Sequence, residues 1–113
     1  MKDSILDRIY GNMLWLFGKY QYKLKIIIDN PNPDQLKRNI IYIVGNKNYH
    51  KWIYMICPSG CGEVIMLSLN QEKSPSWSIT SDSKGRPTIY PSIHKLDGCR
   101  SHFWIKKGKI KWV

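Results

Sequence analysis

The sequence has little negative charge, few cysteines and no long apolar run. It contains only eight Asp and Glu residues against eighteen Lys and Arg residues, so its formal net charge is +10. Its longest apolar runs, such as residues 13–17, are far shorter than the roughly 18 to 20 residues that a membrane span needs. No N-terminal stretch combines a basic region, an apolar run and a small-residue cleavage site. We therefore expect a cytoplasmic protein with no membrane partner.

What is present is typical of one globular domain. Hydrophobic residues make up 42% of the 113 positions, five Trp and seven Tyr among them, which excludes a disordered chain. A domain of this size buries only about two-thirds of its unfolded surface, so a metal ion or a disulfide adds much to its stability. Because no internal repeat or linker interrupts the chain, we expect a single domain over residues 1–113.

A helix followed by a strand is expected over residues 1–30. Ser4 and Asp7 resemble a capping box, and Gly18 marks the helix end. The apolar residues between them repeat at helical spacing: Ile5, Ile9, Met13 and Leu16. Alternation of apolar and polar residues over 20–29 then indicates a strand.

The rest of the chain is predicted to form strands separated by turns. Segments of strand length rich in Ile, Tyr, Val or Trp lie at 39–44, 49–56, 64–69, 88–90, 102–105 and 109–113. The sequence thus predicts a mostly β, small α+β fold: a short N-terminal helix, then an antiparallel sheet or small barrel of about seven strands.

Two pairs of metal-ligand residues stand out among these segments. Cys57 and Cys61 lie at the ends of a Pro/Gly turn, and Cys99 is followed by His102 after two residues. Zinc prefers thiolate and imidazole ligands in a tetrahedron, at about 2.3 Å for sulfur and 2.0 Å for nitrogen. We therefore expect one structural zinc ion held by Cys57, Cys61, Cys99 and His102, which clips the mid-chain turn to the loop before the last two strands.

The cysteines also allow two roles without a metal. Cys57 and Cys61 are small enough to be ordinary buried thiols, with His102 hydrogen-bonded to the backbone. A disulfide between Cys57 and Cys61 leaves Cys99 and His102 unexplained and would be reduced in the cytosol. A closed set of four ligands is typical of a structural metal, so any chemistry is expected beside the zinc ion and not on it.

A series of motifs resembles a known family. The residues are the HKWI run at 50–53, CPSGCG at 57–62, Trp77, RPTIYPSI at 86–93, CRSHF at 99–103 and GKI at 108–110. Together they span residues 49–113 and resemble an uncharacterised family of small zinc-binding proteins found in phages and in bacterial ubiquitin-like conjugation (Bub-type) operons. The resemblance implies a peptidase or isopeptidase of deubiquitinase type that processes or removes a ubiquitin-like modifier. The partners it implies are that modifier or its conjugates, and the activating and conjugating enzymes of the same operon.

Such an activity needs a nucleophile and a base. With the cysteines committed to metal, Ser92 is the candidate nucleophile, because two prolines stiffen the backbone around it. His50 is favoured as its base over His94, which is too close to Ser92 in sequence to approach it easily. Glu63 or Asp97 is expected to orient the imidazole as the third member of a triad. An extended modifier tail is expected to bind by strand addition at sheet edges near residues 87–92.

Two non-catalytic functions remain as alternatives. One is a zinc-binding module for nucleic acid or an acidic protein, with lysines that meet phosphates and aromatic rings that stack bases. The residues for it are Lys106, Lys107, Lys109, Lys111, Trp104 and Trp112. The other is a phage-type inhibitor that covers a host protein. The positive charge by itself is weak support for nucleic-acid binding. Lys, Ile, Asn and Tyr are all abundant, and a bias in the composition of the coding sequence also produces this pattern.

Overall fold

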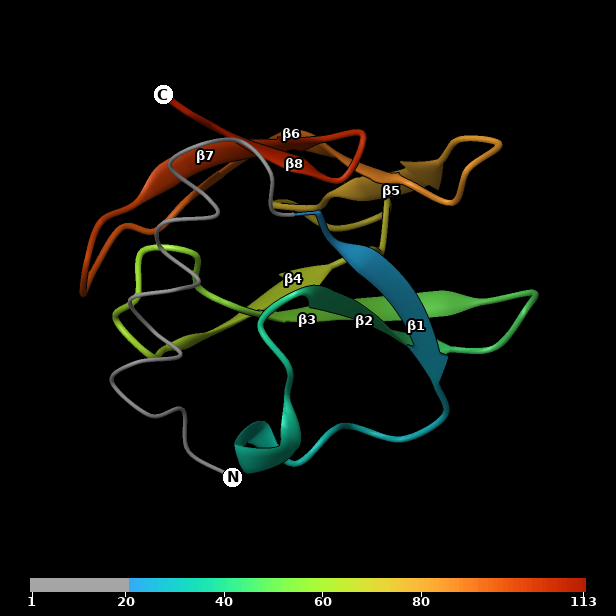
Figure 1. The fold of residues 1–113 in the computed structure, drawn as a ribbon. Coiled ribbons are helices and arrows are strands. Elements are labelled where there is room, and N and C mark those ends of the chain that lie inside the picture. The colour runs from blue at the N-terminus through green and yellow to red at the C-terminus, as the bar shows by residue number, and fades with distance from the viewer. Residues whose placement is uncertain (1–20) are drawn as a thin grey trace.

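The computed structural model describes residues 21–113, which form eight strands in two stacked sheets (Figure 1). The strands are β1 (Lys23–Ile27), β2 (Ile40–Gly45), β3 (His50–Ile56), β4 (Val64–Ser68), β5 (Ser78–Ser81), β6 (Pro87–His94), β7 (His102–Lys106) and β8 (Lys109–Trp112), with a short 3-10 helix η1 (Pro33–Gln35) between β1 and β2. The mostly β prediction is confirmed. The expected N-terminal helix lies outside the described residues.

The two sheets keep separate strand orders, β1-β2-β3-β4 and β5-β6-β7-β8, so the chain forms open sheets and not the barrel that the sequence left possible. All neighbouring strands are antiparallel except β1 and β2, which run parallel. The reason is the Pro-rich crossover after β1, which includes η1 and carries the chain back before β2 begins. No helix within residues 21–113 is long and apolar enough to cross a membrane.

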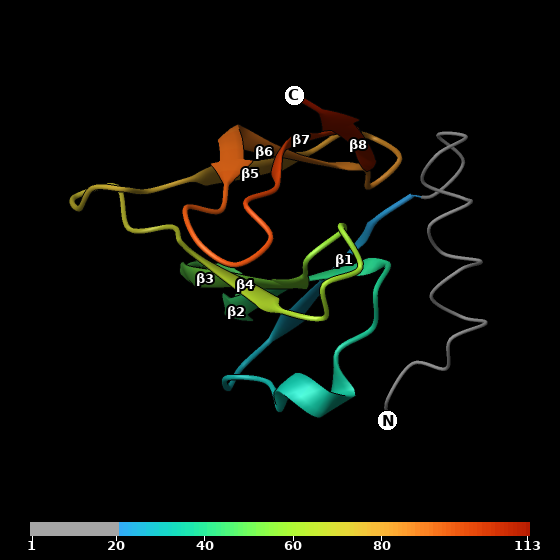
Figure 2. The same ribbon diagram turned by 90° about the vertical axis from the view of Figure 1, so that its left-hand side faces the viewer.

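The core lies between the two sheets, which face each other as two layers (Figure 2). Alternate residues of a strand point to opposite faces, so each sheet contributes every second side chain to this layer. The first sheet and its flanks supply Tyr22, Ile41, Ile53, Met55, Cys57, Ile65 and Leu67, and the second supplies Ile89, Ile93, Phe103 and Ile105. Each large apolar side chain buried this way contributes about 1.5 to 3 kcal/mol to stability.

One side of the molecule brings together two turns that are far apart in sequence. The β3–β4 turn begins at Cys57, whose N–H donates to the carbonyl of Glu63 at 2.9 Å. The β6–β7 loop comes from the other sheet and lies beside this turn (Figures 1 and 2). The Sγ atoms of Cys57 and Cys99 are 3.6 Å apart, so the contact between the two segments is close.

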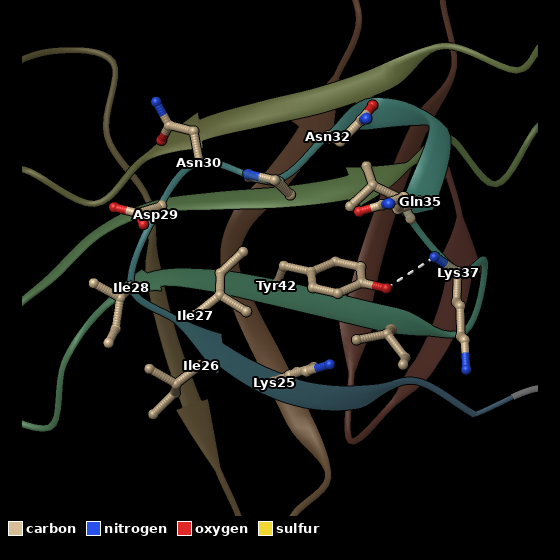
Figure 3. A pocket seen from close by; sticks show the side chains of 13 residues that line it. Lys25, Ile26, Ile27, Ile28, Asp29, Asn30, Asn32, Gln35, Lys37 and Tyr42 are labelled. Atoms are coloured by element: carbon tan, nitrogen blue, oxygen red, sulfur yellow. Dashed lines mark hydrogen bonds between the residues drawn. The ribbon is translucent and has the colours of Figure 1, made fainter. Parts of the chain in front are cut away.

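A hollow of about 600 Å³ lies elsewhere, between β1, η1 and β2 (Figure 3). Ile27 and Tyr42 lie at it, and the Tyr42 hydroxyl accepts a hydrogen bond from the backbone N–H of Lys37 at 2.9 Å. No Ser, Thr, Cys or His lines this hollow, and none of the sequence-predicted site residues lies there.

Candidate active site and thiol cluster

Ser92 and His102 form a hydrogen-bonded pair on neighbouring strands. The Ser92 Oγ in β6 lies 2.9 Å from the Nε2 of His102, the first residue of β7. The pairing of β6 with β7 sets this contact, because His94 is the partner of His102 in the register and Ser92 is two residues before His94 on the same face. When Nε2 carries no proton, the hydroxyl donates to it, which is the arrangement of a nucleophile with its general base.

A bulge in β6 positions Ser92. Ile89 pairs with Ile105 and Ile93 with Phe103, so the three residues 90–92 lie opposite Trp104 alone. Bulges of this kind bend a strand and re-aim a side chain next to functional sites. The indole Nε1 of Trp77 donates to the backbone carbonyl of Ser92 at 3.3 Å, which holds the bulged segment from β5's side of the sheet.

His94 stacks on the ring of His102. The two ring centroids are 4.3 Å apart and the ring planes differ by 12°. Both rings lie on the outer face of the sheet, because Ile93 and Phe103 between them point into the core. No carboxylate within residues 21–113 hydrogen-bonds to His102, so His94 is the side chain that restricts the orientation of this ring.

The three cysteines form a cluster at the loop that precedes His102. The Sγ atoms of Cys57, Cys61 and Cys99 all lie within 4.8 Å of one another. Two hydroxyls line the cluster: Ser59 Oγ is 3.2 Å from Cys57 Sγ, and Ser101 Oγ is 3.1 Å from Cys99 Sγ. No disulfide joins the cysteines, all of which are free thiols.

The environments of two of these thiols differ. Burial raises the pKa of the Cys57 thiol, which is the innermost of the three. The hydroxyl of Ser101 lowers the pKa of the Cys99 thiol to about 6, because a donated hydrogen bond favours the thiolate. The cluster therefore contains one thiol that ionises readily near neutral pH, and thiolates are the form that binds metal.

The donor set fits a metal ion that prefers sulfur. Thiolates at about 2.3 Å from a tetrahedral zinc ion are roughly 3.8 Å apart, and the 3.6 Å between Cys57 and Cys99 matches this spacing. The three cysteines can thus bind one metal ion. His102, the fourth expected ligand, lies outside the cluster, and its Nε2 is hydrogen-bonded to Ser92.

His50 is at a different place in the molecule. It begins β3, whereas Cys57 follows the last residue of the same strand, so the two are about 23 Å apart at 3.3 Å per residue. The His50 Nε2 is buried without a hydrogen-bond partner among the described residues and lines a cavity of about 410 Å³ with Ile43 and Ile79. No hydrogen bond joins His50 to Ser92.

Neither acidic candidate is hydrogen-bonded to a histidine ring among the described residues. The Glu63 carboxylate accepts from the Lys95 ammonium at 3.3 Å, and this ion pair links the β3–β4 turn to the β6–β7 loop. The carbonyl of Asp97 accepts from the backbone N–H of Arg100 within that loop. The structure therefore brings Ser92 together with His102 and His94, and groups Glu63 with the loop that carries Cys99.

The family model described as bacterial ubiquitination-like system serine protease (BubE) matches residues 28–113. The chain belongs to this family. The family resemblance of the motifs in residues 49–113 is thereby confirmed, and the BubE match extends it towards the N-terminus. Neither a curated protein nor a solved structure matches the chain.

The BubE match includes every residue of the pair and of the cluster. A serine protease requires an activated serine. In the described part of the chain, Ser92 is the serine whose hydroxyl is hydrogen-bonded to an imidazole. The sequence alone pointed to Ser92 but assigned His102 to the metal. The contact could have been predicted from a strand that continues past Pro91, because antiparallel pairing then places residue 94 opposite residue 102.

Proposed function

We propose that this chain is a serine peptidase or isopeptidase of deubiquitinase type, with Ser92 as nucleophile and His102 as general base, which processes or removes a bacterial ubiquitin-like modifier. The observation that carries the proposal is the 2.9 Å contact between the Ser92 Oγ and the His102 Nε2. The serine-protease description of the BubE family supports the reaction class, and its ubiquitination-like system supports the substrate class.

The geometry allows the following reaction. The Ser92 Oγ attacks the carbonyl carbon of the scissile bond while its proton moves to the His102 Nε2. The tetrahedral intermediate then collapses, the C–N bond breaks, and the protonated imidazole gives that proton to the leaving amine. A water molecule, deprotonated by the same imidazole, hydrolyses the acyl-enzyme and returns Ser92 to its hydroxyl form.

The stacked ring of His94 takes the positioning role that a carboxylate has in a triad. The centroids of the two rings are 4.3 Å apart, and this stacking limits rotation of the His102 ring and keeps its Nε2 directed at Ser92. His94 touches neither the nucleophile nor the scissile bond in this mechanism, so it is a positioning residue. Aromatic stacking of this kind contributes about 0.5 to 1.5 kcal/mol.

The metal in this proposal is one zinc ion bound by Cys57, Cys61 and Cys99. When bound, it supplies a cross-link between two segments of the chain. The cross-link joins the β3–β4 turn of the first sheet to the β6–β7 loop of the second, and that loop leads directly into His102. The Glu63–Lys95 ion pair at 3.3 Å joins the same two segments. Both contacts hold the start of β7 in register with β6.

Cleavage of a modifier precursor tests the proposal. The purified full chain is incubated with a ubiquitin-like modifier from a bacterial conjugation operon, fused at its C-terminus to a reporter protein. Ser92→Ala removes the nucleophile and His102→Gln removes the base, so each is expected to lower kcat/KM by about 10² to 10⁴. His50→Gln is the matched control, since it changes a histidine outside the pair, and its activity is expected to stay within about threefold of the parent.

Circular dichroism and metal content are measured on every variant, so that misfolding is separated from lost chemistry. Full cleavage by the Ser92→Ala protein rules out the proposed nucleophile. Loss of activity in His50→Gln with normal activity in His102→Gln reassigns the base to His50.

A further inference from the structure

The Ser92–His102 pair lies at one end of an open face of the second sheet. Ile89, Phe103 and Ile105 point into the core, so the residues between them on β6 and β7 point outward. The register aligns these outward residues across the sheet: Trp104 is opposite Lys111, and Lys106 is opposite Lys109. This face is turned away from the first sheet (Figure 2). We call the set of Tyr90, Trp104, Lys106, Lys109 and Lys111 the basic aromatic face.

Its aromatic part is next to Ser92. Tyr90, two residues before Ser92, is 66% exposed, and its ring centroid is 6.1 Å from that of Trp104. The Lys106 Nζ lies 4.7 Å from the centre of the Trp104 ring, a cation–π contact. Two large rings held side by side in solvent are a ready contact for an apolar side chain.

Its basic part is farther from Ser92 and has no acidic neighbour on the sheet. The sequence from Gly98 to Val113 contains no Asp or Glu. Within the described residues, no ion pair involves Lys106, Lys109 or Lys111; the Arg86–Asp82 and Lys95–Glu63 pairs lie elsewhere. Three exposed ammonium groups without a carboxylate partner produce a field that attracts an acidic segment.

Strand addition at residues 87–90, the first part of the 87–92 segment that the sequence suggested, is not available. β6 is an inner strand, paired with β5 on one side and with β7 on the other. The open face offers a polypeptide a path to Ser92 that needs no free strand edge. Trp104 is two residues from His102 along β7 and Lys106 is four, so they lie at about 7 Å and 13 Å from it.

From this spacing we infer that the basic aromatic face binds an acidic, extended tail of the modifier. The inference rests on the proposed function. With the attacked carbonyl at Ser92, an extended chain places an apolar side chain about two residues earlier over Tyr90 and Trp104, and an acidic side chain about four residues earlier at Lys106. The tail before the scissile bond is the part that precursors and conjugates share, so recognition of this tail serves both substrates.

Fluorogenic peptides test the spacing directly. The first has the sequence Glu-Ala-Leu-Ala-Gly with a C-terminal aminocoumarin, and the second has Gln in place of Glu. The Glu peptide is expected to have a kcat/KM about fivefold higher at low salt, mostly through KM, and the advantage falls as salt is added. In the double variant Lys106→Glu, Lys111→Glu the preference disappears or reverses.

The matched control is the double variant Lys25→Glu, Lys47→Glu. It makes the same charge change at exposed lysines of the first sheet and its β2–β3 turn, and it is expected to keep the preference for Glu. An equal kcat/KM for the two peptides, or an equal loss in both double variants, overturns the inference.

A binding arm separates this inference from the proposed function. The Ser92→Ala protein is titrated with fluorescein-labelled forms of both peptides, and anisotropy measures affinity with no cleavage required. Preferential binding of the Glu peptide that is lost in Lys106→Glu, Lys111→Glu supports the face even if the parent protein cleaves nothing. A fluorescein-labelled single-stranded oligonucleotide is titrated alongside. Salt-sensitive oligonucleotide binding without Glu-peptide binding contradicts the inference and supports a nucleic-acid face instead.

Discussion

The Oγ of Ser92 and the Nε2 of His102 are 2.9 Å apart, on two neighbouring strands of one sheet. The three thiols of Cys57, Cys61 and Cys99 gather at the loop that leads into His102. Along the chain, His102 therefore follows the cysteine that this loop adds to the thiol cluster, and its imidazole contacts Ser92. In the proposed function, the chemistry belongs to the strand pair and the cross-link belongs to the loop.

The His102→Gln variant is expected to keep its metal and lose its activity. A base that is not a ligand can be removed without opening the thiol cluster, so metal content stays at that of the parent while peptidase activity falls by about 10² to 10⁴. Plasma mass spectrometry of the desalted protein measures the metal. If this variant is purified metal-free, His102 is a ligand, as the Cys-x-x-His spacing indicated.

Removal of the metal is expected to lower stability. Cys99→Ser deletes one of three thiolates and opens the link between residues 57–61 and 99, so the free energy of unfolding falls by about 2 to 5 kcal/mol. Urea titration with and without a chelator measures the effect. The parent with chelator should match Cys99→Ser, and Cys99→Ser should not respond to chelator. An unchanged urea midpoint of the parent in chelator would contradict a metal cross-link.

Trp77→Phe is expected to affect catalysis more than binding. The substitution removes the indole N–H that donates to the Ser92 carbonyl at 3.3 Å, so the bulge of β6 holds Ser92 less firmly. A lost hydrogen bond of about 0.5 to 1.5 kcal/mol corresponds to a two- to tenfold lower kcat with little change in KM. Trp52→Phe, on β3 of the other sheet, is the control. Equal kcat values for the two variants would remove Trp77 from the positioning of Ser92.

Gly98→Ala is expected to destabilise the protein more than Gly85→Ala. Both glycines have positive φ, +60° and +76°, so each substitution meets a backbone penalty of about 1 kcal/mol. A Cβ at Gly85 meets no atom within 4 Å, whereas at Gly98 it would collide with the Glu63 carboxylate. Displacement of Glu63 also disturbs its ion pair with Lys95, beside Cys99. Urea unfolding compares the variants, and Glu63→Ala combined with Gly98→Ala should recover the difference. Equal stabilities would show that the contact is unimportant.

The sequence predicted most strands closely because their apolar residues alternate. The segments 39–44, 49–56 and 64–69 correspond to β2, β3 and β4 within about one residue at most ends. β6 was predicted only at 88–90, yet it continues to His94 through Pro91. Proline lacks a backbone donor and is typical of strand ends, and here a bulge accommodates it.

That missed half-strand explains why the sequence did not pair Ser92 with its imidazole. The Cys-x-x-His spacing grouped His102 with the metal. Because β6 was not predicted to extend to His94, no residue was expected opposite His102. The cysteines were predicted as a group because ligand spacing is local in each turn. The contact of Ser92 with His102 depends instead on strand register, which short motifs do not encode.

Labelling with a fluorophosphonate tests whether His102 activates Ser92, because this reagent reacts only with an activated serine and needs no knowledge of the substrate. We predict one adduct per chain, mapped by peptide mass spectrometry to Ser92, absent in Ser92→Ala, at least about 100-fold slower in His102→Gln and unchanged in His50→Gln. Labelling that persists in Ser92→Ala, or that proceeds at the parental rate in His102→Gln, would contradict this pairing of nucleophile and base.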